Sequence, residues 1–185
     1  MILQTIIIAV IILLLNVISQ RFYSFLDLTE DKRFTLTSST EKLLNEVDDV
    51  ILIDILLEGE LPSGYKRLRN RTEEVLKQFR IVNGRVEFTF RDPSAGTPKE
   101  ANLVRENLAK DGIFPGTLIL IEEDKKVNKS IYPYAIVKYG ARRIPINLLE
   151  PQLKGENSEI MLNKSENTIE YKFCLLYTSP SPRDS

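Results

Sequence analysis

The run VILIDILL at residues 50–57 decides the fold of this chain of 185 residues. It is almost continuously apolar and rich in isoleucine, which is typical of a strand covered on both faces in a partly parallel sheet. Asp54 is the only charged residue in the run. A carboxylate at this position can serve a functional site, or it can lie at a sheet edge or accept backbone hydrogen bonds, and we favour the structural role.

The residues after this strand predict a helix and a second strand. Between residues 65 and 82, apolar side chains recur at helical spacing, and Asn83-Gly84 is typical of a left-handed helix stop. The arginines of this helix are interpreted as a solvated face. In the segment 86–90, apolar and polar residues alternate as in a half-buried strand, and residues 92–94 then turn the chain.

Two further helix starts carry the spacing of a capping box. Ser38 and Glu41 stand three residues apart before a short apolar face, and Thr97 and Glu100 do the same with Pro98 at the first helical position. We expect the second of these helices to continue to Gly112.

The later residues predict antiparallel strands. A β-rich run at 117–121 is followed by a charged stretch, 122–129, interpreted as a hairpin loop, and the runs 131–137 and 142–146 flank a turn at 139–140. Strand, helix, strand and helix are thus followed by two or three antiparallel strands, which predicts an α/β domain with a mixed sheet.

This order resembles the thioredoxin-like fold. Pro115 precedes the third predicted strand, where that fold commonly holds a cis-proline, although an ordinary loop proline fits as well. The loop after the first strand reads Glu58-Gly59-Glu60-Leu61 and has no cysteine to act as a redox nucleophile. The resemblance in fold therefore implies no oxidoreductase chemistry.

Residues 1–20 carry no charged side chain and predict a transmembrane anchor. Thirteen of residues 2–18 are Ile, Leu or Val, whose insertion is favourable by about 4 to 8 kcal/mol in total. A buried core helix is the alternative, but such a helix usually shows a polar stripe, and a cleaved signal peptide would end in small residues. Arg21, Lys32 and Arg33 alone would hold the following domain in the cytoplasm.

Composition argues against several classes of site. The chain has 25 Lys+Arg against 26 Asp+Glu and no histidine, so it lacks both the basic excess of a nucleic-acid binder and imidazole chemistry. No phosphate-binding, dinucleotide-binding or hydrolase motif is present. The pairs Lys125-Lys126 and Arg142-Arg143 are interpreted as hairpin solubility residues. We therefore nominate no catalytic, cofactor-binding or metal-binding residue.

Four runs together resemble one family, the gliding-motility-associated ABC transporter auxiliary protein GldG, usually described as a substrate-binding component. They are ILLLNVISQRFYSFLDLTEDKRFTLT (12–37), VILIDILLEGELPSGYKRLRN (50–70), YAIVKYGARRIPINLL (134–149) and LNKSENTIEYKF (162–173). The resemblance implies an anchor in the bacterial inner membrane, a soluble domain in the periplasm, and an ABC permease and ATPase as partners. It also settles the orientation that local charge leaves open.

The resemblance also implies a domain organisation. Residues 1–20 are the transmembrane anchor, 21–37 a juxtamembrane segment and 38–150 the thioredoxin-like domain. Members of the family are longer, so 151–173 is interpreted as a linker and helix leading to a missing downstream domain. Residues 174–185, CLLYTSPSPRDS, no longer follow the family and read as a non-native, disordered tail that includes the single cysteine, Cys174.

The function predicted from these observations is non-enzymatic. A membrane-anchored auxiliary subunit, with no cofactor, would act through protein–protein contacts with the transporter. A periplasmic thioredoxin-like enzyme without the CxxC motif and a single-span scaffold unrelated to transport are the alternatives.

Overall fold

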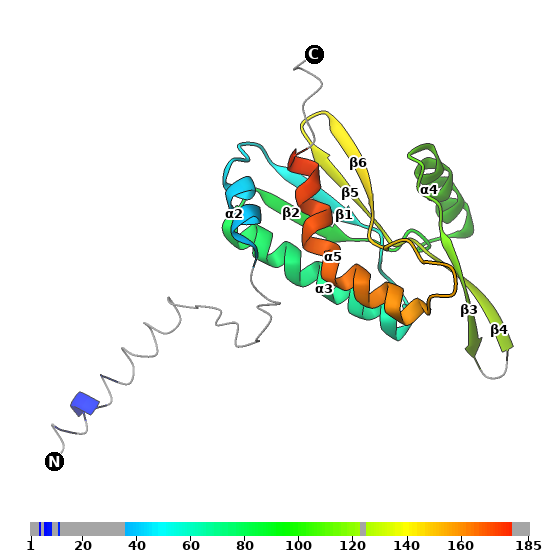
Figure 1. The fold of residues 1–185 in the computed structure, drawn as a ribbon, viewed down its shortest axis with the longest axis horizontal. Helices are drawn as coiled ribbons and strands as arrows, with labels where there is room; N and C mark the ends of the chain where they lie inside the picture. The colour runs from blue at the N-terminus through cyan, green and yellow to red at the C-terminus, as the bar shows by residue number, and fades with distance from the viewer. Residues whose placement is uncertain (1–3, 5, 9–10, 12–35, 123–124, 179–185) are drawn as a thin grey trace. The chain divides into compact units, whose positions relative to one another are not determined.

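The main sheet has the strand order β2-β1-β5-β6 (Figure 1) in a computed structural model that describes residues 4, 6–8, 11, 36–122 and 125–178. β1 (Ile51–Ile55) pairs in parallel with β2 (Val86–Phe90) and antiparallel with β5 (Tyr134–Tyr139). β6 (Arg142–Asn147) pairs antiparallel with β5. The predicted α/β class with a mixed sheet is therefore confirmed.

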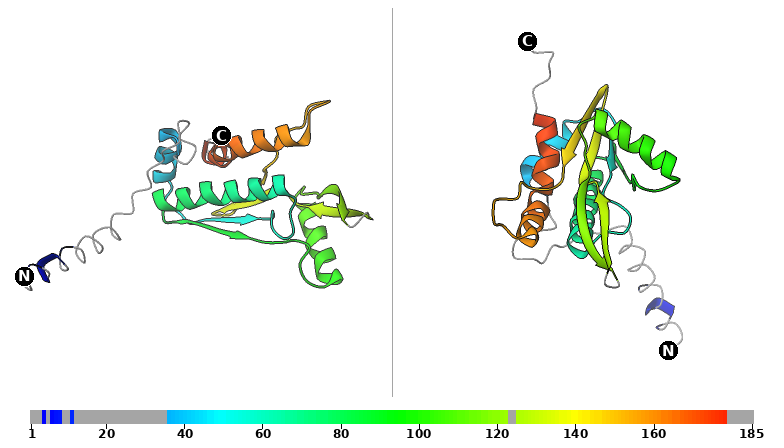
Figure 2. Two further views of the ribbon diagram at one scale, coloured as in Figure 1. Left: turned by 90° about the horizontal axis from the view of Figure 1, so that it is seen from below. Right: turned by 90° about the vertical axis from the view of Figure 1, so that its right-hand side faces the viewer.

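Two long helices cover one face of this sheet. α3 (Ser63–Val82) and α5 (Ser158–Thr178) lie side by side over it, with the short α2 (Ser38–Asn45) at their end (Figure 2). Phe79 of α3 and Phe173 of α5 meet edge to face, with ring centroids 6.3 Å apart. The side chains of Ile51, Ile53 and Ile55 are buried beneath them. This face holds the principal core of the domain.

The other face of the sheet is only partly covered. α4 (Pro98–Lys110) lies on this side (Figure 2), and its Cα atoms come within 8 Å of no other described helix or strand. Leu108 joins a small cluster with Leu56, Ile113, Tyr132 and Ile136, but Leu52 of β1 is 42% exposed. The prediction of a strand covered on both faces is therefore wrong for the described part of the chain, in which no helix lies over Leu52 on the second face.

A separate two-stranded ribbon precedes β5. β3 (Gly116–Glu122) pairs antiparallel with β4 (Lys125–Ile131), and neither strand joins the main sheet. The loop predicted at 122–129 is thus mostly strand, and the ribbon reaches the core through Ile131 of β4. None of the described peptide bonds is cis, so Pro115, just before β3, is an ordinary loop proline.

The helix ends correct two sequence predictions. The N-cap of α2 is Thr37, whose side chain accepts a hydrogen bond from the Thr40 amide, so the box predicted at Ser38 is displaced by one residue. Asn83 after α3 is extended, with φ −131°, and not left-handed. The box at Thr97 is confirmed, with both of its reciprocal hydrogen bonds present.

The C-terminal helix belongs to the same compact unit as the sheet. α5 contributes Ile169 and Phe173 to the core, so the folded unit extends beyond residue 150. Cys174 lies within α5, half-buried, and its Sγ is 3.1 Å from Thr40 Oγ1. The expected disorder is therefore wrong for residues 174–178, which are helical, and Cys174 packs against the core. Residues 179–185 lie outside the described residues.

The predicted membrane span falls largely on residues that the structure does not describe. Of residues 1–20, only 4, 6–8 and 11 are described, and all five are helical. Within the described part of the chain, no helix combines the length and the apolar character needed to cross a bilayer. The anchor therefore stays a prediction.

Candidate functional site

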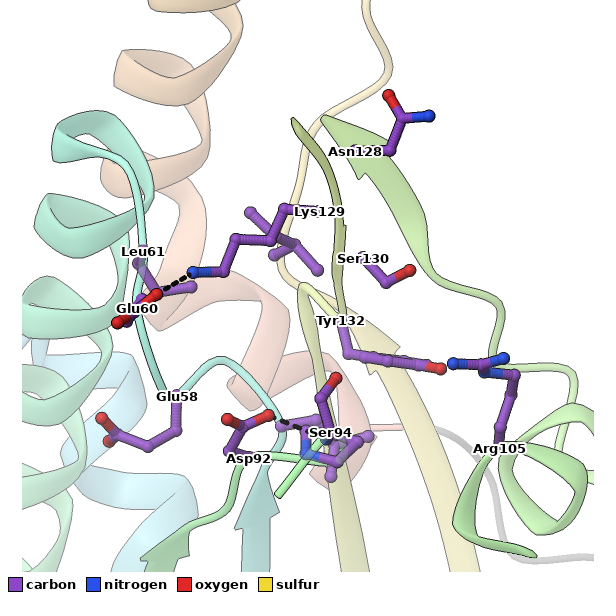
Figure 3. Close-up of a pocket in the computed structure, with 13 residues that line it drawn as sticks. Glu58, Glu60, Leu61, Asp92, Ser94, Arg105, Asn128, Lys129, Ser130 and Tyr132 are labelled. Atoms are coloured by element: carbon purple, nitrogen blue, oxygen red, sulfur yellow. Dashed lines mark hydrogen bonds and ion pairs between the residues drawn. The ribbon is translucent and has the colours of Figure 1, made fainter. Parts of the chain in front are cut away.

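A pocket of about 240 Å³ lies where β1 and β2 end and β5 begins (Figure 3). Ligands of open α/β sheets commonly bind outside the carboxyl ends of the strands, and this pocket occupies that position. We call it the carboxyl-end pocket. It is lined by Leu56, Glu58, Glu60, Leu61, Asp92, Pro93, Ser94, Arg105, Asn128, Lys129, Ser130, Ile131 and Tyr132.

Gly59 allows two loops to meet at the side of this pocket. Its φ of +100° is a conformation that side chains disfavour, and a Cβ built there would lie 2.5 Å from Asp92 Oδ2. Asp92 holds its own loop, since its Oδ1 accepts a hydrogen bond of 2.8 Å from the Ser94 amide. Glycine at position 59 therefore lets the loop after β1 approach the loop after β2 without backbone strain and without displacing the Asp92 side chain.

Ion pairs fix the carboxylates of the loop after β1. Glu58 accepts hydrogen bonds of 3.1 and 2.9 Å from Arg69 Nε and Nη2, and Arg69 also stacks over the Phe90 ring at 4.1 Å. Glu60 accepts one of 2.8 Å from Lys129 Nζ of β4. This hydrogen bond and the charge of Lys129 lower the pKa of the Glu60 carboxyl. The Glu60–Lys129 pair links the ribbon to the loop.

Two polar groups of the pocket have no partner in the part of the chain that the structure describes. Tyr132 is only 3% exposed, yet its hydroxyl makes no hydrogen bond to another described residue. Arg105, on α4, makes neither an ion pair nor a hydrogen bond with the described residues. Figure 3 shows the ring of Tyr132 pointing toward Arg105, so these groups lie at one side of the pocket.

Asp54 lies in a second hollow, of about 330 Å³, between the sheet and α4. Its carboxylate is 2.7 Å from Lys138 Nζ and 3.3 Å from an Arg91 nitrogen, and it is 14% exposed. Asp54 thus has a structural role, but its partners are cationic side chains of neighbouring strand segments. The expectation of an edge position or backbone partners is wrong, because β1 is a central strand.

The other charged groups singled out in the sequence hold elements together. Arg143 of the predicted solubility pair is 2.8 Å from Asp111, and Lys125 and Lys126 lie in β4. Arg67 of α3 pairs with Glu159 and Glu166 of α5, which joins the two helices. The arginines of α3 are therefore not simply a solvated face. Among the described residues, no three acidic or cysteine side chains group as a metal site would require.

Sequence reasoning did not single out Arg105 or Tyr132. Two signals were present: the Asp92-Pro93-Ser94 turn directly follows a strand, and Tyr132 directly precedes the proline before β5. The rule that sites form at the carboxyl ends of parallel strands would have pointed to the turn. The ribbon residues were missed because their segment was interpreted as a loop.

Comparison with known families gives one match. The family described as domain of unknown function DUF7088 matches residues 30–138, which is more than half of the chain and includes β1, α3, β2, α4 and both strands of the ribbon. No curated protein and no solved structure matches the chain.

Proposed function

We propose that the chain, which belongs to the DUF7088 family, is a non-enzymatic auxiliary subunit of an ABC transporter associated with gliding motility. Its soluble domain would lie in the periplasm of a bacterium, anchored in the inner membrane by residues 1–20. It would act by binding, through contacts with the ABC permease and ATPase subunits. The resemblance of the sequence to GldG supports this assignment of partners and location.

The observation that carries the proposal is the exposed apolar surface of the α4 segment. Leu103 is 60% exposed, Phe114 is 62% exposed, and Val104 also faces solvent. We call these three residues the α4 surface. Exposed apolar side chains that lie next to one another, as Leu103 and Val104 do in sequence, can mark a contact site for another protein, whereas single exposed apolar residues are common on protein surfaces. The α4 surface therefore favours a domain that docks onto a partner.

The chemistry of the carboxyl-end pocket also favours binding. Glu58 and Glu60 are held by Arg69 and Lys129, and the hydrogen bond and charge of Lys129 lower the pKa of the Glu60 carboxyl. Such a group anchors a loop or a ligand better than it donates a proton. The pocket therefore suits recognition better than acid–base catalysis.

We also propose that the domain is thioredoxin-like. A parallel β1–α3–β2 unit and the antiparallel β5–β6 hairpin share one sheet, with α3 and α5 on one face. The sequence expectation rested on the order of strands and helices between residues 38 and 150, without α5, and the β3–β4 ribbon is then an insertion before β5. A thioredoxin-like enzyme without CxxC has the same topology, so it stays the alternative that activity measurements must address.

Affinity purification of the full chain from membranes tests the function. We expect a permease and an ATPase of the ABC class to co-purify, and Leu103→Arg to weaken their recovery. Ile81→Arg is the matched control, because Ile81 is 81% exposed on α3, away from the α4 surface. Equal recovery with both variants would contradict the role of the α4 surface. Wild-type chain that captures no transporter subunit would favour the scaffold.

A reporter fused after Ser185, which keeps α5 in the domain, tests the location. An enzyme active only in the periplasm should function at this site, because the resemblance places the whole soluble domain outside the cytoplasm. Activity of a reporter that functions only in the cytoplasm would contradict the orientation.

A further inference from the structure

We propose that the carboxyl-end pocket binds a carboxylate that lies next to an aliphatic side chain, as in the C-terminal residue of a peptide or in a free N-acyl amino acid. The inference deepens the proposed function, on which it rests for the premise that the pocket binds its ligand without reaction. It names the chemistry that the pocket recognises.

The first step is the pair of unpartnered donors. Tyr132 is 3% exposed and lines the pocket, and its hydroxyl makes no hydrogen bond to the described residues, so this donor is available to a ligand. Arg105 brings a guanidinium to the same side of the pocket (Figure 3). A guanidinium offers a planar fork of N–H donors that matches the two oxygens of a carboxylate, and a hydroxyl adds one more donor. Together these groups fit an anionic, oxygen-rich ligand.

The second step is that the other cations near the pocket are already engaged. Lys129 is paired with Glu60, and Arg69 is paired with Glu58. Figure 3 places Glu58 and Glu60 on the side of the pocket away from Arg105. The charge of Arg105 is therefore left for a ligand. Of the acidic lining residues, Glu58 and Glu60 are held in ion pairs, and Asp92 accepts a hydrogen bond from the Ser94 amide at Oδ1 without a cationic partner among the described residues.

The third step concerns what accompanies the carboxylate. The lining includes the buried apolar side chains of Leu56, Pro93 and Ile131, which can accept an aliphatic group released from water. The volume, about 240 Å³, lies below the roughly 300 to 1,000 Å³ of pockets that enclose drug-sized ligands. One amino-acid residue with its carboxylate fits this scale better than a nucleotide or a cofactor does.

The test compares three probes on the full chain in detergent, with binding followed by calorimetry. N-acetyl-leucine presents the carboxylate on a small acid, and acetyl-Ala-Ala-Leu presents it at the end of a peptide. N-acetyl-leucinamide, called leucinamide below, keeps the side chain and the acetyl group but has no carboxylate. We expect at least one of the acids to bind, and leucinamide to bind at least tenfold more weakly. The ratio of the two acid affinities distinguishes a small-molecule ligand from a peptide terminus.

Two variants assign the binding to this pocket. Tyr132→Phe removes only the hydroxyl, and Arg105→Gln removes the charge from an exposed position where folding is not at risk. Each should weaken binding of the better acid about tenfold or more, because hydrogen bonds to a charged group are lost. The matched controls are Tyr171→Phe, on an exposed residue of α5, and Lys99→Gln, elsewhere on α4. Both controls should bind within twofold of the wild type.

Several results would overturn the inference. They are no binding of either acid, equal binding of leucinamide, and unchanged binding by Arg105→Gln. None of these results tests the proposed transporter partners, because the same variants should still recover the permease and ATPase through the α4 surface. If the wild-type chain recovered neither the permease nor the ATPase, the proposed function would be refuted, whereas the result on carboxylate binding would still hold.

Discussion

The sheet face that carries Ile51, Ile53 and Ile55 is covered by α3 and α5, whereas the opposite face, which carries Leu52 and Asp54, meets only the edge of the α4 segment. On the covered face, helices joined by ion pairs and an aromatic contact enclose a continuous apolar core. On the open face, a smaller apolar cluster lies beside charged side chains and two hollows.

The difference separates two tasks within one domain. Apolar burial supplies most of the free energy of folding, and the covered face holds most of the buried apolar side chains. The open face keeps polar groups and space that a packed core would exclude. We therefore expect substitutions on the covered face to change stability and those on the open face to change binding. The predictions that follow test this division.

The largest effect is expected for Phe173→Ala. Phe173 is fully buried between α5 and α3, so its truncation should lower the free energy of unfolding by about 3 to 5 kcal/mol. Urea unfolding of the full chain in detergent measures this. Leu103→Ala on α4 is the control and should change stability by less than about 0.5 kcal/mol. Similar losses at both positions would contradict the division between the faces.

A smaller loss is expected for Asp54→Ala, the exception on the open face. The substitution would leave Lys138 and Arg91 without the carboxylate that they share. Because both cations remain accessible to water, we expect a loss of about 1 kcal/mol. Glu87→Ala on the neighbouring strand is the control, because Glu87 is exposed. If unfolding free energies of the two variants were equal, Asp54 would have no structural role.

Thr97→Ala should cost about 1 kcal/mol, because the Thr97 side chain caps α4. Ser38→Ala is the control, since Ser38 carries the same sequence signal although Thr37 caps α2. Hydrogen exchange of the α4 amides measures the local effect, and we expect faster exchange with Thr97→Ala alone. Unchanged exchange in α4 would show that this helix is held by its packing at Leu108.

The smallest effect concerns pH and the covered face. Hydrogen bonds from Lys172 and Thr168 of α5 lower the pKa of the Glu150 carboxyl below its usual 4.5. The pKa of Glu150 is lower in the folded chain than in the unfolded chain, so the charged carboxylate stabilises the folded state. This stabilisation is present above the pKa of the unfolded chain and is lost as pH falls through the pKa of the folded chain. The stability difference between wild type and Glu150→Gln should therefore be constant from pH 7 to about 5 and shrink below that. If the stability difference between wild type and Glu150→Gln grew as pH fell, folding would raise the pKa of Glu150, contrary to this prediction.

Much of the fold could be predicted from local sequence patterns. The helices at 63–82 and 98–110 and the strands at 51–55, 86–90, 134–139 and 142–147 lie close to the predicted segments. Periodicity reports how often a side chain meets a core, so it finds elements that pack against one. It failed at β4, whose polar residues pair in a ribbon without entering the core. It also failed to show that VILIDILL has one open face, because the position of α4 is a tertiary property.

The candidate site was less predictable than the fold. Its groups come from loops and strands distant in sequence: Gly59 follows β1, Asp92 follows β2, Arg105 lies on α4 and Tyr132 precedes β5. No spacing rule predicts that such residues meet, because the tertiary arrangement of the sheet, α4 and the ribbon brings them together. The hydrogen bond from Lys129 to Glu60 spans 69 residues and leaves no local signal.

The β3–β4 ribbon gives the domain a way to change what it recognises. Its strands pair only with each other, yet Asn128, Lys129 and Ser130 form part of the wall of the carboxyl-end pocket. Insertions or substitutions in the ribbon could therefore diversify ligand preference among related proteins without disturbing the register of β1, β2, β5 and β6. An engineer could exchange this hairpin as a cassette, with Lys129 retained to pair with Glu60, and redirect the pocket while the scaffold stays constant.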